Sequence, residues 1–428
     1  MRSFRTLAAK LDLANGELQR FFTNDDDAKE QGEGTKRKKN LFSSRDRANY
    51  AVRKNNLDKA IGEVEEWQRL SFDPLWFETM KAQKQQFDTM LKHSASGSSS
   101  AGEKMMRATL SVQDPLRDLG TSNVFLPAQK LESAKMTEIP YSSVKLVQVD
   151  HKWRLMDVVP NLSSETVREL AVRLKKADPA TFGLLTCLGA VDHTPHDRYR
   201  IIFRMPDKMS APVTLREKLI TAKGAGTMHS LSDRFRIATQ LARAVFHLHT
   251  FDMVHKSIQP ENILLFKDAG SSLGSAFLLG FERVRRDVDD SRLSGDVDWA
   301  KNLYRHPERQ GANIQERYIM QHDIYSLGVC LLELGLWSSP TASEALSRIG
   351  PSTGTAPEIV KSHLLDLAVD ELPAKMGRRY ASVFEACLTC LDIGNDSFDD
   401  VEDLRDEHVG VGVRFIEKVL MQLSEISI

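Results

Sequence analysis

Apolar residues recur at helical spacing within residues 1–90, in two separate stripes. The second stripe comprises Leu57, Ile61, Val64 and Trp67. Two amphipathic helices in so short a segment bury their apolar faces only by packing on each other or on a partner. The pattern therefore predicts a helical segment over 1–90 that self-associates through the second stripe.

A stretch of serine, glycine and alanine follows at 94–102. This composition offers few side chains to bury and is typical of flexible linkers. The sequence beyond it stays weakly patterned up to about Pro140. We therefore expect a flexible linker over 91–139, with a domain boundary inside it.

Strand-like patterns dominate residues 140–206, and helical patterns dominate 207–428. The run 144–156 is rich in β-branched residues, and apolar and polar residues alternate over 199–204, as in a half-buried strand. Beyond Pro206, capping-box residues predict two helix starts. Strands first and helices afterwards predict a two-lobed α+β unit, with a small lobe at 140–206 and a large lobe at 207–428.

Charge and composition narrow the classes of partner. The 428 residues include 58 Lys and Arg against 59 Asp and Glu, so no overall basic field attracts nucleic acid. The most apolar late stretch, 329–337, contains Glu333 and is far shorter than the ~20 residues of a membrane span. Four scattered cysteines are too few for a disulfide scaffold. We expect no nucleic-acid partner, no membrane span and a cytoplasmic location.

The segment 254–265 reads Val-His-Lys-Ser-Ile-Gln-Pro-Glu-Asn-Ile-Leu-Leu and resembles the catalytic loop of protein kinases. Leu-Gly-Phe-Glu at 279–282 stands where kinases have Asp-Phe-Gly, and Arg-His-Pro-Glu at 305–308 stands where they have Ala-Pro-Glu. Asp-Ile-Tyr-Ser-Leu-Gly at 323–328 looks like the start of the central helix of the large lobe. These matches, in kinase order and with kinase spacing, predict a two-lobed protein kinase-like fold.

The same matches lack the side chains of phosphoryl transfer. A kinase uses one Asp to accept the hydroxyl proton and another to bind the metal, and here Ser257 and Gly280 stand at those positions. A serine cannot serve as an anionic base, and a glycine offers the metal no side-chain oxygen. Only Asn262 remains of the set, and one neutral ligand binds Mg²⁺ poorly. The sequence thus predicts a kinase-like protein that is catalytically dead, and leaves activity of the Ser/Thr kinase class open.

The nucleotide site is weakened as well. No glycine occurs between residues 122 and 183, so the glycine-rich loop that covers phosphates in kinases is missing. Lys152 precedes Glu169 by 17 residues and is a candidate for the lysine–glutamate pair, with Lys145 as a rival and two solvated charges as the plain alternative. Main-chain groups at Met205, in the predicted hinge, could hold an adenine. No cofactor is certain, and any ATP binding is expected to be weak.

Other residues have architectural interpretations. The resemblance implies that His255 braces the loop and that Asp323 accepts hydrogen bonds from its main-chain amides. Glu308 pairs with a late arginine in kinases, but no arginine stands at the corresponding place, so its partner stays open. Cys387 and Cys390 have no second ligand pair and are interpreted as core residues rather than half of a zinc site. We therefore predict no metal site.

Four segments, 248–258, 302–310, 387–392 and 411–420, together resemble a narrower group. They look like the kinase-like domains of filamentous fungi that follow a prion-inhibition and propagation (HeLo) helical domain, a family in which the catalytic Asp is commonly Ser in a His-Lys-Ser string. The resemblance covers about 140–428, whereas in the first ninety residues only 45–70 resembles the later HeLo helices. It implies a role in fungal non-self recognition and regulated cell death.

Two functions from different classes remain. The first is a pseudokinase that acts as a regulatory or scaffolding module for protein partners in fungal signalling. The second is an atypical ATP-dependent Ser/Thr kinase that uses another carboxylate, such as Asp287 or Asp289, for the metal. The two missing aspartates and the missing glycine loop favour the first.

Overall fold

The structure is a computed structural model that describes residues 123–426 with gaps. The gaps lie at 133, 161, 194–198, 207–208, 210–211, 226–228, 268–270, 287–297, 312–313, 315–316, 341–345, 347–356, 393–394, 396–397, 399–410 and 413. The predicted helical segment 1–90, with its self-association stripe, lies outside the described residues, as does the serine-rich part of the predicted linker.

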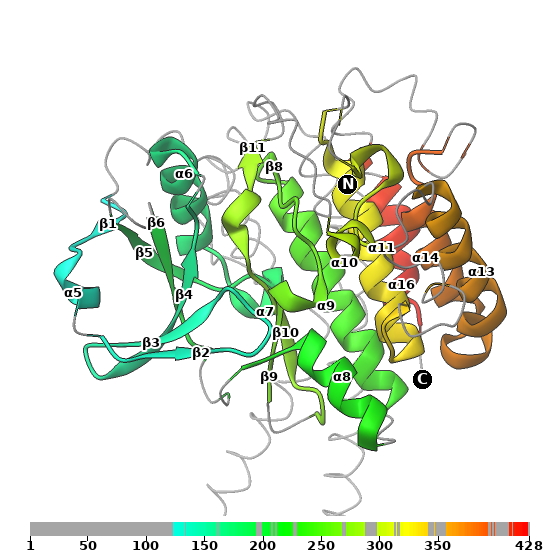
Figure 1. The fold of residues 1–428 in the computed structure, drawn as a ribbon, viewed down its shortest axis with the longest axis horizontal. Coiled ribbons are helices and arrows are strands. Elements are labelled where there is room, and N and C mark those ends of the chain that lie inside the picture. Colours follow the sequence, from blue (N-terminus) through cyan, green and yellow to red (C-terminus); the bar gives the residue numbers. More distant parts are fainter. Residues whose placement is uncertain are drawn as a thin grey trace, which may run out of the picture. The chain divides into compact units, whose positions relative to one another are not determined.

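A six-stranded sheet forms the first part of the described chain (Figure 1). Its strands are β1 (Phe125–Leu126), β2 (Met136–Glu138), β3 (Lys145–Val149), β4 (Lys152–Val158), β5 (Cys187–Asp192) and β6 (Tyr199–Arg204). They lie in the order β1-β5-β6-β4-β3-β2, and every neighbouring pair is antiparallel except β1 with β5. The helix α6 (Ser164–Lys175) lies between β4 and β5 in the chain and packs beside β5.

The linker ends earlier than the sequence predicted. Residues 123–139, which we assigned to the linker, supply β1, β2 and the short helix α5 (Gln129–Glu132). Leu131 of this segment packs with Val147 and Met156 in a buried cluster of the sheet. Two- and three-residue strands and a four-residue helix are too short to show a periodic pattern, which is why the sequence did not reveal them.

The mixed run at 144–156 lies in a hairpin of β3 and β4. Asp150 and His151 take left-handed backbone angles, with φ of 50° and 59°, between β3 and β4. Two consecutive residues with positive φ form the turn whose twist suits a two-residue hairpin. The turn sets the register of β4, so Lys152 is its first residue and Asp157 lies near its end.

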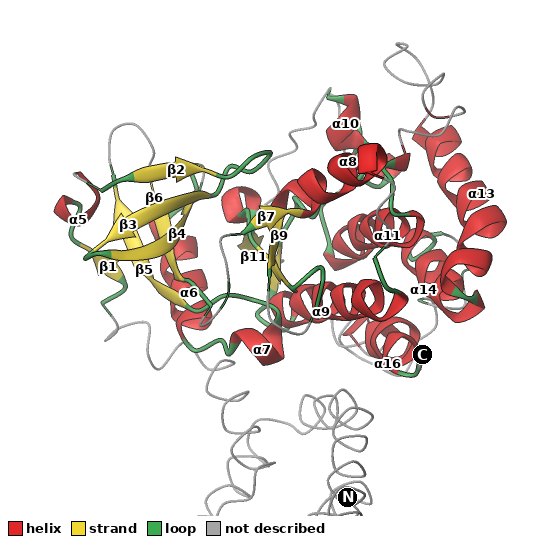
Figure 2. Ribbon diagram, turned by 90° about the horizontal axis from the view of Figure 1, so that it is seen from below, coloured by secondary structure: helices red, strands yellow, loops and turns green. Residues whose placement is uncertain are grey.

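The second part of the chain is mainly helical (Figure 2). Its described α-helices are α8 (Leu215–Ala225), α9 (Leu231–His249), α10 (Trp299–Asn302), α11 (Met320–Leu336), α13 (Pro357–Met376), α14 (Arg378–Leu388) and α16 (Met421–Ser424), the last preceded by a π-helix at Ile416–Leu420. The short helix α7 (Pro179–Phe182) precedes β5 in the chain and packs against α9. Ser230 caps α9 by accepting a hydrogen bond from the amide of Asp233, as the capping box predicts. The almost wholly buried α11 packs against α9, α13 and α14. In the described ranges, no helix has both the length and the hydropathy that crossing a membrane requires.

Two small sheets hold the kinase-like loop segments. One contains β7 (Val213–Thr214), β9 (Ile263–Phe266) and β10 (Ser275–Leu278), and the other pairs β8 (Met253–Val254) with β11 (Arg285–Arg286). The loop 255–259 follows β8, and Gly280 follows β10. The pairing of β9 with β10 continues in a hydrogen bond from the amide of Leu279 to the carbonyl of Asn262, at 2.9 Å. The fold is therefore α+β, and its small sheets bring Asn262 next to Gly280.

Candidate functional site

The carboxylate of Asp323, in the first turn of α11, holds the loop that follows β8. Its two oxygens accept hydrogen bonds from the amides of His255 and Lys256, at 2.6 and 2.9 Å. The hydroxyl of Tyr318 and the ring of His249 contact the same carboxylate, at 2.7 and 3.1 Å. Burial alone would raise the pKa of this carboxyl, but the hydrogen bond and charge of His249 hold it below the usual value. The loop is thus tied to α11 through a buried, ionised group.

His255 braces the loop from the other side. Its Nε2 lies 3.0 Å from the carbonyl oxygen of Leu279, so this nitrogen carries a proton and donates it. The ring also packs beside that of Phe281, with 5.3 Å between ring centroids. Burial lowers the pKa of His255 to about 4, so the imidazole is neutral at pH 7. A ring held this way positions the segment 279–281 and is not placed to act as a base.

Asn262 occupies the space beside Gly280. Its Nδ2 donates hydrogen bonds to the carbonyl and the hydroxyl of Ser257, at 2.7 and 3.1 Å. A Cβ atom built on Gly280 would lie 2.2 Å from Cγ of Asn262, and Gly280 has a left-handed φ of 81°. The position that carries the metal-binding Asp in a kinase therefore has no room for a side chain while Asn262 stays where it is.

Asp157 of β4 is a buried acid that the sequence analysis did not select. Its Oδ2 accepts hydrogen bonds from the amides of Gly280 and Phe281, at 3.0 and 2.8 Å. Burial raises its pKa from 3.8 to about 7, against the lowering effect of those two amides. The sequence does contain a signal for this residue, because Asp157 is an acid inside the apolar run 155–159. An Asp is almost never fully buried without a partner, so an acid in such a run indicates a specific contact.

The place of Asp157 bears on nucleotide binding. In protein kinases, the strand before the regulatory helix carries a lysine that binds the nucleotide phosphates and pairs with a glutamate of that helix. Here β4 precedes α6 and directs a carboxylate, not a lysine, at the segment that matches Asp-Phe-Gly. When ionised, this carboxylate repels phosphate, and one of its oxygens is already engaged by two amides.

The predicted pair of Lys152 and Glu169 does not form. Lys152 is exposed at the start of β4 and precedes Asp157 by five residues, which is about 16 Å along a strand. The buried Glu169 instead forms salt bridges with Arg173, at 2.6 Å, and with Arg286 of β11. The helix α6 is thereby joined to the chain segment that follows Gly280.

The rival lysine and the hinge residue lie away from this carboxylate too. Lys145 of β3 pairs with Glu138 of the neighbouring strand, at 2.8 Å. Met205 follows directly on β6 and is half-buried. Since Arg204 pairs with Arg154 in the register of β6 with β4, Met205 lies near the beginning of β4. Asp157 is therefore separated from the predicted hinge along the strand.

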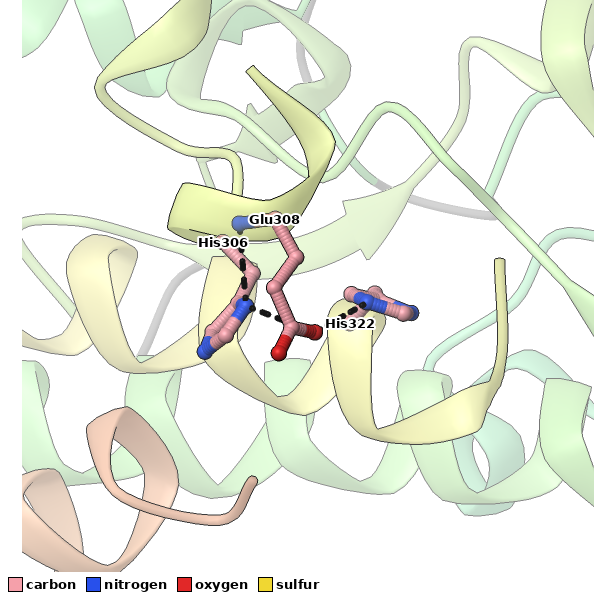
Figure 3. A group of neighbouring side chains, drawn as sticks. All are labelled: His306, Glu308 and His322. Carbon is pink, nitrogen blue, oxygen red and sulfur yellow. Dashed lines mark hydrogen bonds and ion pairs between the residues drawn. The ribbon is translucent and has the colours of Figure 1, made fainter. Parts of the chain in front are cut away.

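Glu308 lies beside two histidines (Figure 3). Its Oε2 is 3.5 Å from Nδ1 of His306 and 3.9 Å from Nε2 of His322. Burial lowers the pKa of these rings to about 4 and about 3, respectively, so both are neutral at pH 7.

The side chains of His306, Glu308 and His322 are close enough to one another for a shared metal ion. However, Nδ1 of His322 accepts a hydrogen bond from the amide of Ile319, at 2.9 Å, which leaves the ring proton on the nitrogen that faces Glu308. A protonated ring nitrogen has no lone pair for a metal, so in this ring orientation the three side chains do not form a metal site.

No protein-family model matches the chain. Segments of it are similar to curated protein kinases. It is 30% identical over 116 residues to a serine/threonine-protein kinase-like protein of Arabidopsis thaliana. The matched residues make up 27% of this chain and 30% of that protein. A leucine-rich repeat receptor-like protein kinase of the same plant is 28% identical over 174 residues, covering 37% of this chain and 15% of that protein.

A third relative is a membrane-associated tyrosine- and threonine-specific cdc2-inhibitory kinase of Caenorhabditis elegans. It is 36% identical over 99 residues, which is 23% of this chain and 13% of that protein. The matched regions thus span less than a third of each of these relatives. They agree with the loop, helix and sheet arrangement described above, and the chain therefore carries a protein kinase-like domain.

Proposed function

We propose that this chain is a pseudokinase, a kinase-like module that regulates or scaffolds protein partners and does not transfer phosphate. The observation that carries the proposal is the contact between Asn262 and Gly280. A metal-binding carboxylate is absent there, and the remaining ligand of the set binds Ser257 instead. Without the metal, the charge that develops on a transferred phosphoryl group has no partner.

Asp157 of β4 supports the same proposal. In a kinase, positive charge at this strand neutralises the nucleotide phosphates. A carboxylate bonded to the amides of Gly280 and Phe281 offers the opposite charge and holds the segment in one conformation. Phosphoryl transfer would thus lack the base, the metal ligand and the phosphate-binding lysine together.

The biological setting of the proposal comes from the sequence resemblance to fungal kinase-like domains that follow HeLo domains. We infer a role in fungal signalling or non-self recognition, in which the kinase-like domain restrains or relays a signal from a helical segment. The domain boundaries at 90 and 206 and the self-association of the N-terminal helices belong to this proposal. Limited proteolysis followed by mass spectrometry of the fragments would test the division.

An atypical Ser/Thr kinase is the alternative, and the described residues do not favour it. It would need another carboxylate to hold the metal, and the candidates Asp287 and Asp289 lie outside the described residues. Asp157, the buried acid that contacts the segment at 280–281, is already engaged because it accepts hydrogen bonds from both amides.

We predict no transfer of phosphate by the full chain. With radiolabelled ATP, Mg²⁺ and casein as the acceptor, labelling is expected to equal that of the Ser257→Ala variant, because neither protein has an anionic base. Transfer that depends on Mg²⁺ and disappears in Asn262→Ala would contradict the pseudokinase proposal.

We further predict that any ATP binding is independent of metal. Calorimetric titrations with and without Mg²⁺ are expected to give the same Kd within about threefold, because Gly280 supplies no ligand and Asn262 is engaged. Tightening by Mg²⁺ of about tenfold or more, equal to ~1.4 kcal/mol, would show that a working metal site exists.

A further inference from the structure

A polar pocket opens beside the loop that follows β8. The basic side chains in its lining are Lys256, Arg283, Lys301 and Arg305. The acidic one is Glu282. The lining therefore carries a surplus of positive charge, which favours an anionic ligand.

The pKa of Lys256 indicates a positive electrostatic potential in this pocket. The pKa of its ammonium group is lowered from 10.5 to about 8. Burial is the largest cause, followed by the positive charges of Arg285, Arg309 and Arg283. The carboxylate of Asp323 acts in the opposite direction and does not offset them. A dianion in the pocket would relieve this repulsion between like charges.

Neutral donors complete the lining. The hydroxyl oxygen of Ser257 accepts from Asn262, at 3.1 Å, so its own hydrogen can point into the pocket. Gln259 lines the same pocket with a side-chain amide for which the described residues provide no hydrogen-bond partner. A phosphate group prefers such an environment, in which charged and neutral donors converge on its oxygens.

The position of the pocket indicates what kind of molecule carries the phosphate. Ser257 lines it, at the position where the Asp of an active kinase meets the hydroxyl group of a protein substrate. A serine or threonine side chain of a bound peptide reaches that point from solvent. In an active kinase the carboxylate there repels a phosphorylated side chain, whereas the hydroxyl of Ser257 removes this repulsion and adds a donor.

We propose that this pocket binds the phosphomonoester of a phosphoserine or phosphothreonine in a partner protein. The inference rests on the proposed function, since a chain that transfers no phosphate can hold a phosphorylated side chain as its ligand rather than release it as a product. Lys256, Lys301 and Arg305 supply the positive charge, and Ser257 and Gln259 supply hydrogen bonds.

Fluorescence anisotropy of the full chain tests the inference. The probe is a fluorescein-labelled nonapeptide of alanine and glycine with one central phosphoserine, compared with its unphosphorylated twin. The phosphopeptide is expected to bind at least about tenfold more tightly. Lys301→Gln and Ser257→Asp should each weaken its binding at least about fivefold, because each removes positive or adds negative charge in the lining. Lys375→Gln, the same change at an exposed position of α13, should have no effect.

Equal binding of the two peptides, or no binding of either, would overturn the phosphate pocket. So would phosphopeptide binding that survives both Lys301→Gln and Ser257→Asp in proteins with unchanged thermal melts, since the anion would then bind elsewhere. Failure of the pseudokinase proposal looks different. It would appear as Mg²⁺-dependent phosphorylation of the unphosphorylated twin, which the same samples measure with radiolabelled ATP.

Discussion

Replacing Asp157 with alanine is expected to lower the free energy of unfolding by about 2–4 kcal/mol, because the amides of Gly280 and Phe281 lose their acceptor. Asp157→Asn keeps an oxygen that accepts both hydrogen bonds and should lose less than Asp157→Ala at pH 8. Urea unfolding followed by circular dichroism measures both variants. If Asp157→Ala were as stable as the wild-type protein, the carboxylate would not hold this segment.

The pH dependence of Asp157→Asn provides a second readout. Burial raises the folded-state pKa of Asp157 from 3.8 to about 7, so the folded state binds the proton more tightly than the unfolded state. Its stabilising contribution is therefore complete below pH 3.8 and is lost as pH rises through 7. Between pH 5.5 and pH 8 this group should lower the free energy of unfolding of the wild-type protein by about 2 kcal/mol.

Asp157→Asn should remove that part of the pH dependence. Glu333, whose pKa burial raises to about 7, and the buried histidines titrate in both proteins. The difference between the wild-type and variant curves therefore reports Asp157 alone. Parallel curves from pH 5.5 to pH 8 would contradict the raised pKa.

Gly280→Asp, which restores the side chain of an active kinase, is expected to destabilise the fold by about 2–5 kcal/mol. A left-handed φ costs an L-residue about 1–2 kcal/mol, and overpacking against Asn262 adds about 1–3 kcal/mol. The new Cβ would lie 2.2 Å from Cγ of Asn262. Chemical unfolding gives the loss directly.

Gly311→Asp is the matched control. Gly311 has the same φ of 81°, but among the described residues no atom beyond its chain neighbours lies within 4 Å of a Cβ built there. It should show the backbone penalty alone, about 1–2 kcal/mol. Adding Asn262→Gly to Gly280→Asp should recover the overpacking part, which a double-mutant cycle measures. Equal losses for Gly280→Asp and Gly311→Asp would mean that Asn262 does not fill the space.

Contiguous motifs made much of the site predictable. The string at 254–265 located the loop and its serine, and the string at 323–328 located the aspartate that binds its amides. Helix starts beyond Pro206 were visible because a cap and the amides it binds lie within three residues of each other, as at Ser230. Interactions of this kind are local in the chain, so a single sequence displays them.

Strand register was not predictable in the same way. The two-residue turn at Asp150 and His151 sets the register of β4, and in that register Asp157 faces the segment at 280–281 while Lys152 lies at the far end of the strand. A one-residue slip would turn every side chain of that strand to the other face. One partner of Glu169 was hidden for a related reason, because Arg286 is 117 residues away in the chain.

The sequence by itself determined which chemical groups are missing: the carboxylates at 257 and 280 and any glycine between 122 and 183. A missing side chain is missing in every conformation, so this conclusion needed no coordinates. Only the tertiary structure decided what takes their place. Asn262 fills the space beside Gly280, Asp157 binds the amides that follow β10, and Arg286 reaches Glu169. These contacts join segments far apart in the chain, and strand pairing and helix packing, rather than local pattern, bring them together.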